Sequence, residues 1–166
     1  KRASATKMIN NKRGEVLMES LIAITIAVVG ILGMFNLLSR SMSLSRVISD
    51  RYVAANLGQE GVEIVKNIID ANILQKRPWN QGLQPGFYEV EYDGGLLTDE
   101  NRNLFYNSAT GFYGYDSNGE ATKFKRQMRV ERIGANEIKA EAIMKWTSRG
   151  GAIFEEIFED HFLNWQ

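Results

Sequence analysis

The longest hydrophobic stretch of the chain lies close to its N-terminal end. Residues 20–39 form a run of 20 positions without a charged side chain, bounded by Glu19 and Arg40. With a rise of about 1.5 Å per residue, a helix of this length crosses a hydrocarbon core of roughly 30 Å. The run therefore predicts a membrane-spanning helix. Glu19 is a candidate functional residue, because an ionisable group at the edge of hydrocarbon needs a partner.

Beyond Arg40 the apolar residues recur at steps of three and four, which is typical of an amphipathic helix. They are Leu44, Val47, Ile48, Ala54, Ala55, Leu57, Val62, Val65 and Ile69. No proline precedes Pro78, so one helix is predicted from about Glu15 to about Asn72. The segment 77–86, which contains both prolines, should end it.

Gly30, Gly33, Gly58 and Gly61 interrupt this helix, and each weakens an exposed helix by roughly 1 kcal/mol relative to alanine. Two interpretations stand side by side. The glycines mark tight helix–helix contact, or they allow local stretching of the helix.

The C-terminal half alternates between apolar and polar residues, as strands do. Segments 87–92, 124–130 and 137–146 each place apolar side chains on one face and charged ones on the other. An antiparallel sheet of this kind covers something on one side only, and the apolar face of the second half of the helix is the simplest candidate. From Ala152 onward the pattern fits both periods. A strand is expected to about Phe158, with a helical last turn.

Residues 96–120 are rich in Asn, Gly, Ser and Tyr and show little regular pattern. Segments 103–106 and 112–115 are compatible with a short hairpin. Asn118-Gly119 predicts a turn, because this pair readily adopts the positive φ of tight hairpins. The aromatic side chains at 104–115 either stack on sugars or bases at the surface or fold inward beneath the sheet, and the inward arrangement is favoured.

The residues around the apolar run resemble the class III signal of type IV prepilins. Gly14 is followed by Glu15-Val16-Leu17-Met18-Glu19 and then by the uncharged run. The resemblance implies that a prepilin peptidase cuts after Gly14 and methylates the new N-terminus at Glu15. It also implies that Glu19 directs assembly. The family usually begins its mature chain with Phe or Met, whereas this one begins with Glu15.

The C-terminal part resembles minor pilins of the PilV kind. Phe124-Lys125-Arg126 precedes a strand, Lys145-Trp146 closes the next, and a Gly-Gly turn leads to a last segment ending Leu163-Asn164-Trp165. The implied fold is α+β and pilin-like: one long N-terminal helix, membrane-spanning in its first half, packs its second half on a small antiparallel sheet. The expected divisions are a basic leader (1–14), a transmembrane and assembly half (15–40), an amphipathic half (41–76) and a β-sheet head (77–166).

Charge is unevenly distributed although the chain as a whole is neutral. The first 14 residues carry five basic side chains and no acid, and the remainder holds 15 basic and 20 acidic residues. A basic flank is typical of the cytoplasmic side of a membrane, which predicts a single-pass protein whose head lies outside. After the cut no basic surplus remains to support nucleic acid as a partner. The apolar run is longer than that of a secretory signal and lacks its small-residue cleavage site. Met8, as an initiator, would leave a seven-residue leader.

The sequence offers no convergent set of catalytic residues, so no enzyme, cofactor or metal is expected. Cysteine is absent and His161 is the single histidine. Glu155, Glu156, Glu159 and Asp160 are interpreted as a solvated face. Asp116, Asn118 and Glu120 resemble the start of a calcium loop, but the glycine comes one step early and no downstream Glu follows, which favours a turn.

The sequence therefore predicts a structural subunit, most simply a minor type IV pilin that forms a cell-surface filament. Its expected partners are a prepilin peptidase, other pilin subunits, the assembly platform in the membrane, and lipid. A type II secretion pseudopilin shares the leader and the apolar helix. A membrane-anchored binding module that never polymerises is the alternative from another class. Glu19 separates them, because a simple anchor has no use for an acid at that depth.

Overall fold

A computed structural model describes residues 2–93 and 95–164, with side chains described from Gly14 onward. The chain separates into two compact units, residues 1–47 and residues 48–166. The first unit is helical throughout its described residues. The second contains the last part of the same helix and all the strands.

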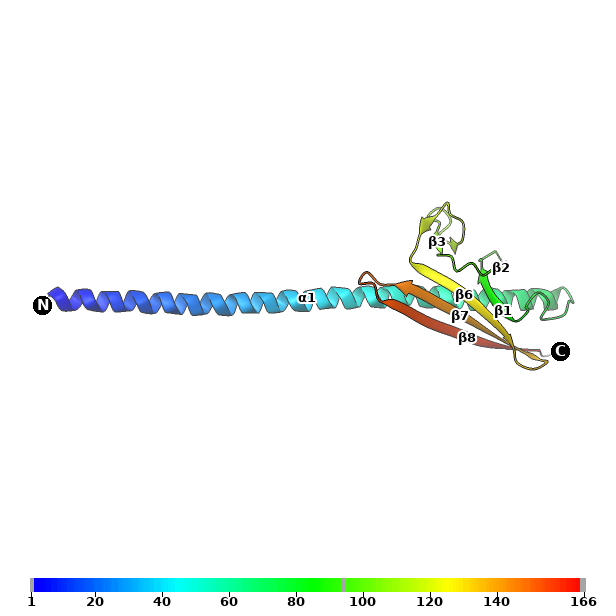
Figure 1. Cartoon of the computed structure of the whole chain (residues 1–166), viewed down its shortest axis with the longest axis horizontal. Coiled ribbons are helices and arrows are strands. Elements are labelled where there is room, and N and C mark those ends of the chain that lie inside the picture. The colour runs from blue at the N-terminus through cyan, green and yellow to red at the C-terminus, as the bar shows by residue number, and fades with distance from the viewer. Residues whose placement is uncertain (1, 94, 165–166) are drawn as a thin grey trace. The chain divides into compact units, whose positions relative to one another are not determined.

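The fold is α+β, with one long N-terminal helix followed by antiparallel sheets (Figure 1). The main sheet has the order β2-β1-β6-β7-β8 and the small one the order β4-β3-β5. The elements are α1 (Arg2–Leu74), β1 (Gly86–Val90), β2 (Leu96–Thr98), β3 (Phe105–Tyr106), β4 (Tyr113–Gly114), β5 (Glu120–Ala121), β6 (Phe124–Arg132), β7 (Glu137–Thr147) and β8 (Ile153–Leu163).

The predicted helix is confirmed, and its end lies within two residues of the expected one. It begins at Arg2 rather than Glu15, so the basic segment expected as a leader is helical too. At its C-terminal end Lys76 adopts a left-handed conformation with φ of 56°. Its N–H and that of Arg77 bond to the carbonyls of Ile73 and Asn72, which satisfies free carbonyl groups of the last turn. The Asn72 amide donates to the carbonyls of Trp79 and Gln81, at 3.3 and 2.8 Å, and so fixes the linker.

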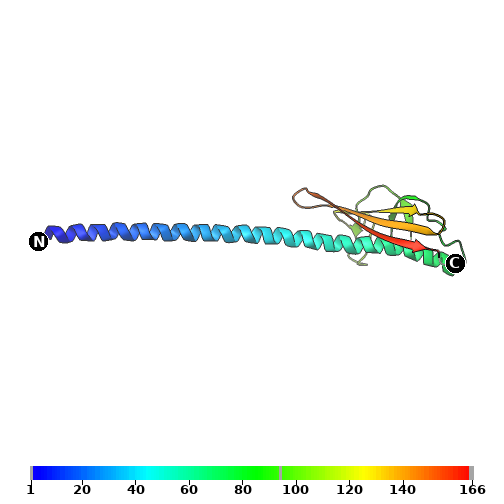
Figure 2. The same ribbon diagram turned by 90° about the horizontal axis from the view of Figure 1, so that it is seen from below.

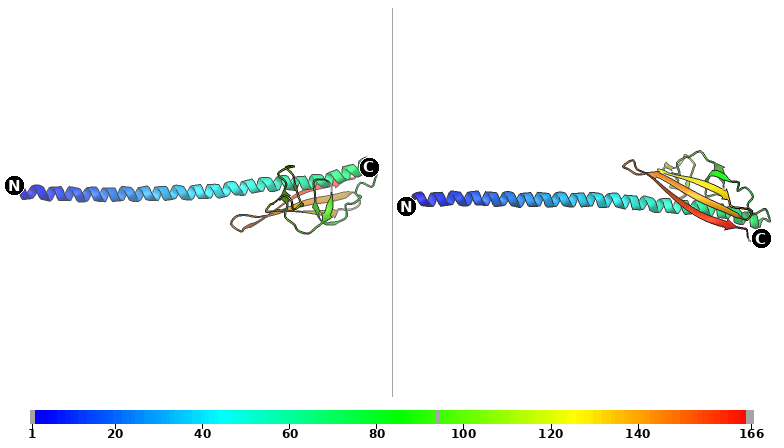
Figure 3. Two further views of the ribbon diagram at one scale, coloured as in Figure 1. Left: turned by 90° about the horizontal axis from the view of Figure 1, so that it is seen from above. Right: turned by 60° about the horizontal axis from the view of Figure 1, so that its bottom comes forward.

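The main sheet covers the C-terminal part of α1, as the amphipathic pattern predicts. Its strands cross the helix obliquely and lie on one side of it (Figures 2 and 3). One cluster of buried side chains joins Ile64, Val65 and Ile69 of the helix to β1, β6 and β7. A second joins Ala54 and Leu57 to the ends of β6 and β7 and to residues of the small sheet. The two clusters form the core of the second unit.

Gly58 and Gly61, two of the four glycines considered above, lie where α1 packs closely against the sheet. A Cβ at Gly58 would come within 2.3 Å of the Phe158 ring, and one at Gly61 within 2.8 Å of Met128 Sδ. At these positions the glycines serve tight packing, against a sheet rather than another helix. Gly30 and Gly33 have no atom within 4 Å of such a Cβ, so they make no packing contact with the described part of the chain.

Strand β8 continues past Phe158, and the last turn, expected to be helical, lies partly outside the described residues. It remains extended to Leu163 because it pairs with β7 over its full length, from Thr147↔Ile153 to Glu137↔Leu163. Phe154, Phe158 and Phe162 lie on one face of the strand and pack against the two core clusters. The period of two therefore prevails over the helical one.

The turn at Asn118-Gly119 is present, but its conformation differs from the expected one. The Gly119 N–H bonds to the Asp116 carbonyl at 3.3 Å, yet neither Asn118 nor Gly119 has a positive φ. The turn is held by the Asp116 carboxylate, which accepts the Asn118 N–H at 3.0 Å. It links β4 to β5, and both strands pair with β3 rather than with each other. The short hairpin of β3 and β4 is confirmed.

Gly58→Ala tests the close approach of the helix and sheet. Alanine favours a helix by about 1 kcal/mol over glycine, whereas overpacking costs about 1–3 kcal/mol. We expect a net loss of up to about 2 kcal/mol in the free energy of unfolding, measured by denaturant titration of the full chain in detergent with tryptophan fluorescence. In a Phe158→Leu background the same substitution should be neutral or stabilising. A stabilised single variant would contradict the packing assigned to Gly58.

Candidate functional site

The apolar run is helical and its side chains are uncovered. Every described residue from Gly14 to Arg46 is exposed, including Leu17 at 71% and Leu37 at 70%. Within the described part of the chain, α1 holds the one stretch long and apolar enough to cross a membrane, judged by length and composition. So large an uncovered apolar surface requires lipid or other protein around it.

Three of the neutral polar side chains of this stretch form hydrogen bonds within the helix. Ser20 Oγ donates to the Val16 carbonyl at 2.8 Å, Thr25 Oγ1 to Leu21 at 2.7 Å, and Asn36 Nδ2 to Leu32 at 3.1 Å. Each bond reaches back one turn. These side chains can therefore enter hydrocarbon without leaving all their polar groups unbonded.

Gly14, Glu15 and Glu19 lie on the exposed helix at the start of this stretch. Glu15 and Glu19 are one turn apart, so their like charges disfavour each other. From Gly14 onward, no described side chain forms a hydrogen bond or ion pair with either carboxylate. A Cβ at Gly14 would meet no atom within 4 Å. All three predicted site residues are thus open to another molecule.

The acidic residues of β8, interpreted as a solvated face, are divided between both faces of the sheet and take part in specific contacts. Glu155 pairs with Lys145 at 3.2 Å and Glu159 with Lys139 at 3.5 Å, whereas Glu156 reaches Arg51 of the helix at 3.2 Å. Asp160 accepts the N–H of His161. The expectation of a simple solvated face is therefore wrong in part.

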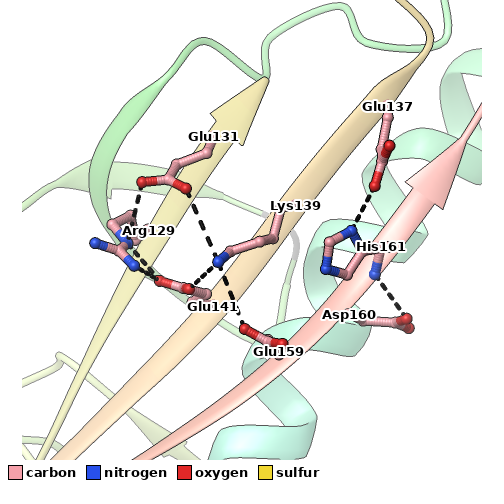
Figure 4. Close-up of polar contacts among 8 residues, drawn as sticks. All are labelled: Arg129, Glu131, Glu137, Lys139, Glu141, Glu159, Asp160 and His161. Carbon is pink, nitrogen blue, oxygen red and sulfur yellow. Dashed lines mark hydrogen bonds and ion pairs between the residues drawn. The ribbon is translucent and has the colours of Figure 1, made fainter. Parts of the chain in front are cut away.

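Figure 4 shows the polar network on the outer face of the sheet. Glu141 lies at its centre with 3% of its surface exposed, and it accepts bonds from both Arg129 and Lys139. Burial alone would raise the pKa of Glu141, but the bonds from Lys139 and Arg129 outweigh it and hold the pKa below its ordinary value. His161 Nδ1 lies 2.5 Å from Glu137 Oε1 at the edge of the same face.

Arg126 is a buried residue that sequence reasoning missed. It shares the inner face of β6 with Phe124 and Met128, and its side chain is fully buried. The guanidinium donates to the carbonyls of Leu57 in α1 and Val90 in β1, at 3.0 and 2.7 Å. Glu60 lies 3.3 Å away as its counter-ion. One feature of the sequence indicated this burial: Arg126 lies two residues from both Phe124 and Met128, on the apolar face of the strand.

Glu89 is a second missed residue, on the face expected to be charged and solvated. It is 1% exposed because the segment after β2 covers it. Arg102 supplies both its backbone N–H, at 2.7 Å, and its guanidinium. The outer face of the sheet is therefore covered in part, whereas the pattern predicts coverage on one side only.

The side chains of segment 104–115 adopt both predicted arrangements, some folded inward and some exposed at the surface. Leu104 and Tyr115 fold inward, and the Tyr115 hydroxyl donates to the Arg126 carbonyl at 2.9 Å. Burial raises the pKa of Tyr115 to about 12, so the hydroxyl remains a donor at neutral pH. Phe112 points outward, is half exposed and stacks on Tyr92.

The segment considered as a calcium loop forms a turn instead. One Asp116 oxygen is engaged by Asn118, and β5 begins at Glu120. Among the described residues, no group of three or more metal-ligating side chains comes together.

Three lysines gather around an open pocket of about 480 Å³ at the end of β6 and β7 nearest the β7–β8 turn. Each has an acceptor within the chain. Lys123 pairs with Asp50 at 2.6 Å, Lys125 donates to the Asn101 carbonyl at 2.9 Å, and Lys145 pairs with Glu155. Their charge is largely compensated, which agrees with the absence of a basic surplus in the sequence.

No family model matches the chain, and neither curated proteins nor solved structures give a significant match. The likeness to prepilins therefore depends on the residues themselves: Gly14, the acid Glu19 and the uncharged run that follows it.

The Glu141 network predicts a specific dependence of stability on pH. Because the folded pKa of Glu141 is lower than its ordinary value of 4.5, its contribution is present above about pH 4.5 and is lost as the pH falls through the folded value. Glu141→Gln should lower the free energy of unfolding by about 1–2 kcal/mol at pH 7. The deficit should shrink toward pH 3 in denaturant titrations. Glu155→Gln, on the exposed neighbouring pair, is the control and should have little effect at either pH. An unchanged deficit at pH 3 would contradict the role of the charge.

Proposed function

We propose that this chain is a type IV pilin-like structural subunit, more specifically a minor pilin of the PilV kind. It is stored in the cytoplasmic membrane and assembled into a cell-surface filament. One observation carries the proposal. Gly14 and the unpartnered acid Glu19 stand at fixed spacing before a helix of 20 uncharged residues whose side chains are all exposed.

The first step is hydrolysis of the Gly14–Glu15 peptide bond by a prepilin peptidase. The bond lies inside α1, so the helix must open locally before a peptidase can bind it in an extended form. Glycine at position 14 lowers the cost of that opening, because it is about 1 kcal/mol less favourable in a helix than alanine. The product is a chain whose new amine stands at Glu15, one turn before Glu19.

The second step is assembly through Glu19 and the apolar helix. A lone carboxylate near hydrocarbon costs several kcal/mol, and pairing with the amine of a neighbouring subunit offsets that cost. A subunit that enters without this pairing keeps the cost, so the pair both selects subunits and sets their axial position. Apolar contacts among the exposed side chains of residues 20–39 then hold neighbouring helices together.

The basic flank before the apolar run supports an orientation with the N-terminus in the cytoplasm and the head outside. The partners in this scheme are the prepilin peptidase, membrane lipid, the assembly platform and other pilin subunits. A type II secretion pseudopilin would use the same leader, helix and Glu19. A membrane-anchored binding module would use the helix alone.

The processing step predicts a defined product. Coexpressed with a prepilin peptidase, the chain should begin at Glu15, with or without an added methyl group, by intact mass and N-terminal sequencing. Gly14→Val should leave the leader attached, because its branched side chain adds bulk beside the bond to be cut, at the position where the prepilin signal has glycine. Gly30→Val, the same change within the apolar run, should be processed normally. An unprocessed wild-type chain would reject the pilin assignment and favour the anchored module.

The Glu19→Leu variant tests filament assembly independently of cleavage by the peptidase. The variant should still be processed and reach the membrane, but its incorporation into sheared filaments should fall by at least about tenfold, as expected for the loss of a partly buried charge pair. Ser20→Ala is the matched control, since the Ser20 hydroxyl bonds only within its own helix. Normal filaments from Glu19→Leu would show that the chain does not assemble by this pairing.

A further inference from the structure

A small cavity of about 220 Å³ lies on the head where the chain leaves β1 and passes the small sheet. It is lined by Glu91, Tyr92, Asp93, Phe105, Asn107, Thr110, Phe112, Tyr113, Gly114 and Asp116. Its volume is below the usual range for drug-sized ligands, so it suits a single side chain or a similarly small group.

One wall of the cavity is an exposed aromatic pair. The rings of Tyr92 and Phe112 stack at 4.5 Å between centroids with 10° between planes, and each residue is 50% exposed. Each ring covers one face of the other, and half of the surface of each residue remains exposed. Aromatic surface that remains exposed beside a cavity offers a stacking platform to a ligand.

The loop that carries Phe112 is held in place by its own hydrogen bonds. Asn107 Oδ1 accepts the N–H groups of Ala109 and Thr110, and Thr110 Oγ1 accepts that of Phe112. The Gly111 N–H bonds to the Asn107 carbonyl at 2.8 Å with φ of 78°. The aromatic platform is therefore ordered before any ligand arrives, which reduces the entropy cost of binding.

The charge of the lining is of one sign. Glu91, Asp93 and Asp116 contribute carboxylates, and no lining residue is basic. Glu91 Oε1 accepts the Tyr115 N–H and Asp116 Oδ1 accepts from Asn118, so each keeps a second oxygen for another donor. Asp93 forms no hydrogen bond or ion pair with the described residues. Bonds from Asn118 lower the pKa of Asp116, which keeps it ionised at neutral pH.

We propose that this cavity binds the guanidinium group of an arginine side chain presented by an extended segment of a partner protein. A guanidinium is planar and stacks on an aromatic face, while its fixed N–H groups donate to carboxylate oxygens. Both features of the cavity match that chemistry, and the surplus of acids selects a cation over a neutral group. The proposal does not depend on whether the chain polymerises.

The first test compares two ligands that differ in charge and hardly in shape. The full chain in a non-ionic detergent is titrated calorimetrically with acetyl-Gly-Arg-Gly-amide and with the same peptide carrying citrulline. We expect millimolar binding of the arginine peptide and at least about tenfold weaker binding of the citrulline peptide. Raising the salt concentration should weaken the arginine peptide further. Equal binding of the two peptides, or tighter binding of choline than of the arginine peptide, would overturn the proposal.

The second test uses matched variants. Phe112→Leu removes the outer ring face while keeping an apolar side chain, and Phe87→Leu makes the same change at another phenylalanine with 50% exposure outside the cavity. Asp93→Asn removes a cavity charge, and Asp70→Asn removes an exposed one elsewhere.

The dissociation constant of the arginine peptide should rise by about fivefold or more for each cavity variant and stay unchanged for each control. If a cavity variant and its control changed the dissociation constant equally, the arginine peptide would bind outside this cavity. Tryptophan fluorescence reports whether each variant folds. The citrulline comparison uses the unaltered chain and so does not depend on any variant folding.

Discussion

The covered face of α1 between Ala54 and Ile69 is the contact on which the head depends. Without it the main sheet would expose the inner faces of β1, β6 and β7, and the helix would expose an apolar stripe. The same helix is apolar all round over residues 20–39 and apolar on one face beyond Arg40. A helix surrounded by apolar side chains requires an apolar environment on every side, whereas a stripe requires one covering element. The change in pattern along α1 therefore marks the change from a segment that the chain leaves uncovered to one that the sheet covers.

Polar groups inside this contact determine how the sheet lies on the helix. Arg126 is fully buried and joins a helix carbonyl at Leu57 to a strand carbonyl at Val90, with Glu60 as counter-ion. A guanidinium bonded in this way fits few arrangements of the surrounding backbone, because every displaced donor would remain buried without an acceptor. Gly61 makes the room, since a Cβ there would lie 3.1 Å from Arg126 Cδ. Apolar burial thus supplies the attraction, and the arginine joins the helix backbone to the sheet backbone in this arrangement.

Local pattern predicted the elements well and the partners of charged residues poorly. The long helix and the β6–β7 pair follow from periods and turn residues that lie close together in the sequence. Strand β8 was ambiguous, because residues 153–163 satisfy both periods and only pairing with β7 decides between them. Arg126 and Glu89 were placed wrongly or overlooked, since their partners lie 69 and 13 residues away. Such burial depends on which distant segment covers a strand, and a single sequence does not encode that in any local period.

Glu19 differs in kind from the other polar groups of the apolar helix. Ser20, Thr25 and Asn36 donate to carbonyls of the preceding turn, but an ionised carboxylate can only accept, and helix N–H groups beyond the first turn are already bonded. Glu19 therefore needs a donor from outside its own helix. Under the proposed function that donor is the amine at residue 15 of a neighbour, four residues from the neighbour's own Glu19. Placing the amine level with the carboxylate displaces the two parallel helices by about 6 Å along their axes, at about 1.5 Å per residue. A pairing of this kind is heterologous and leaves a free amine at one end and a free acid at the other, which is the requirement for continued growth of a filament rather than closure into a dimer.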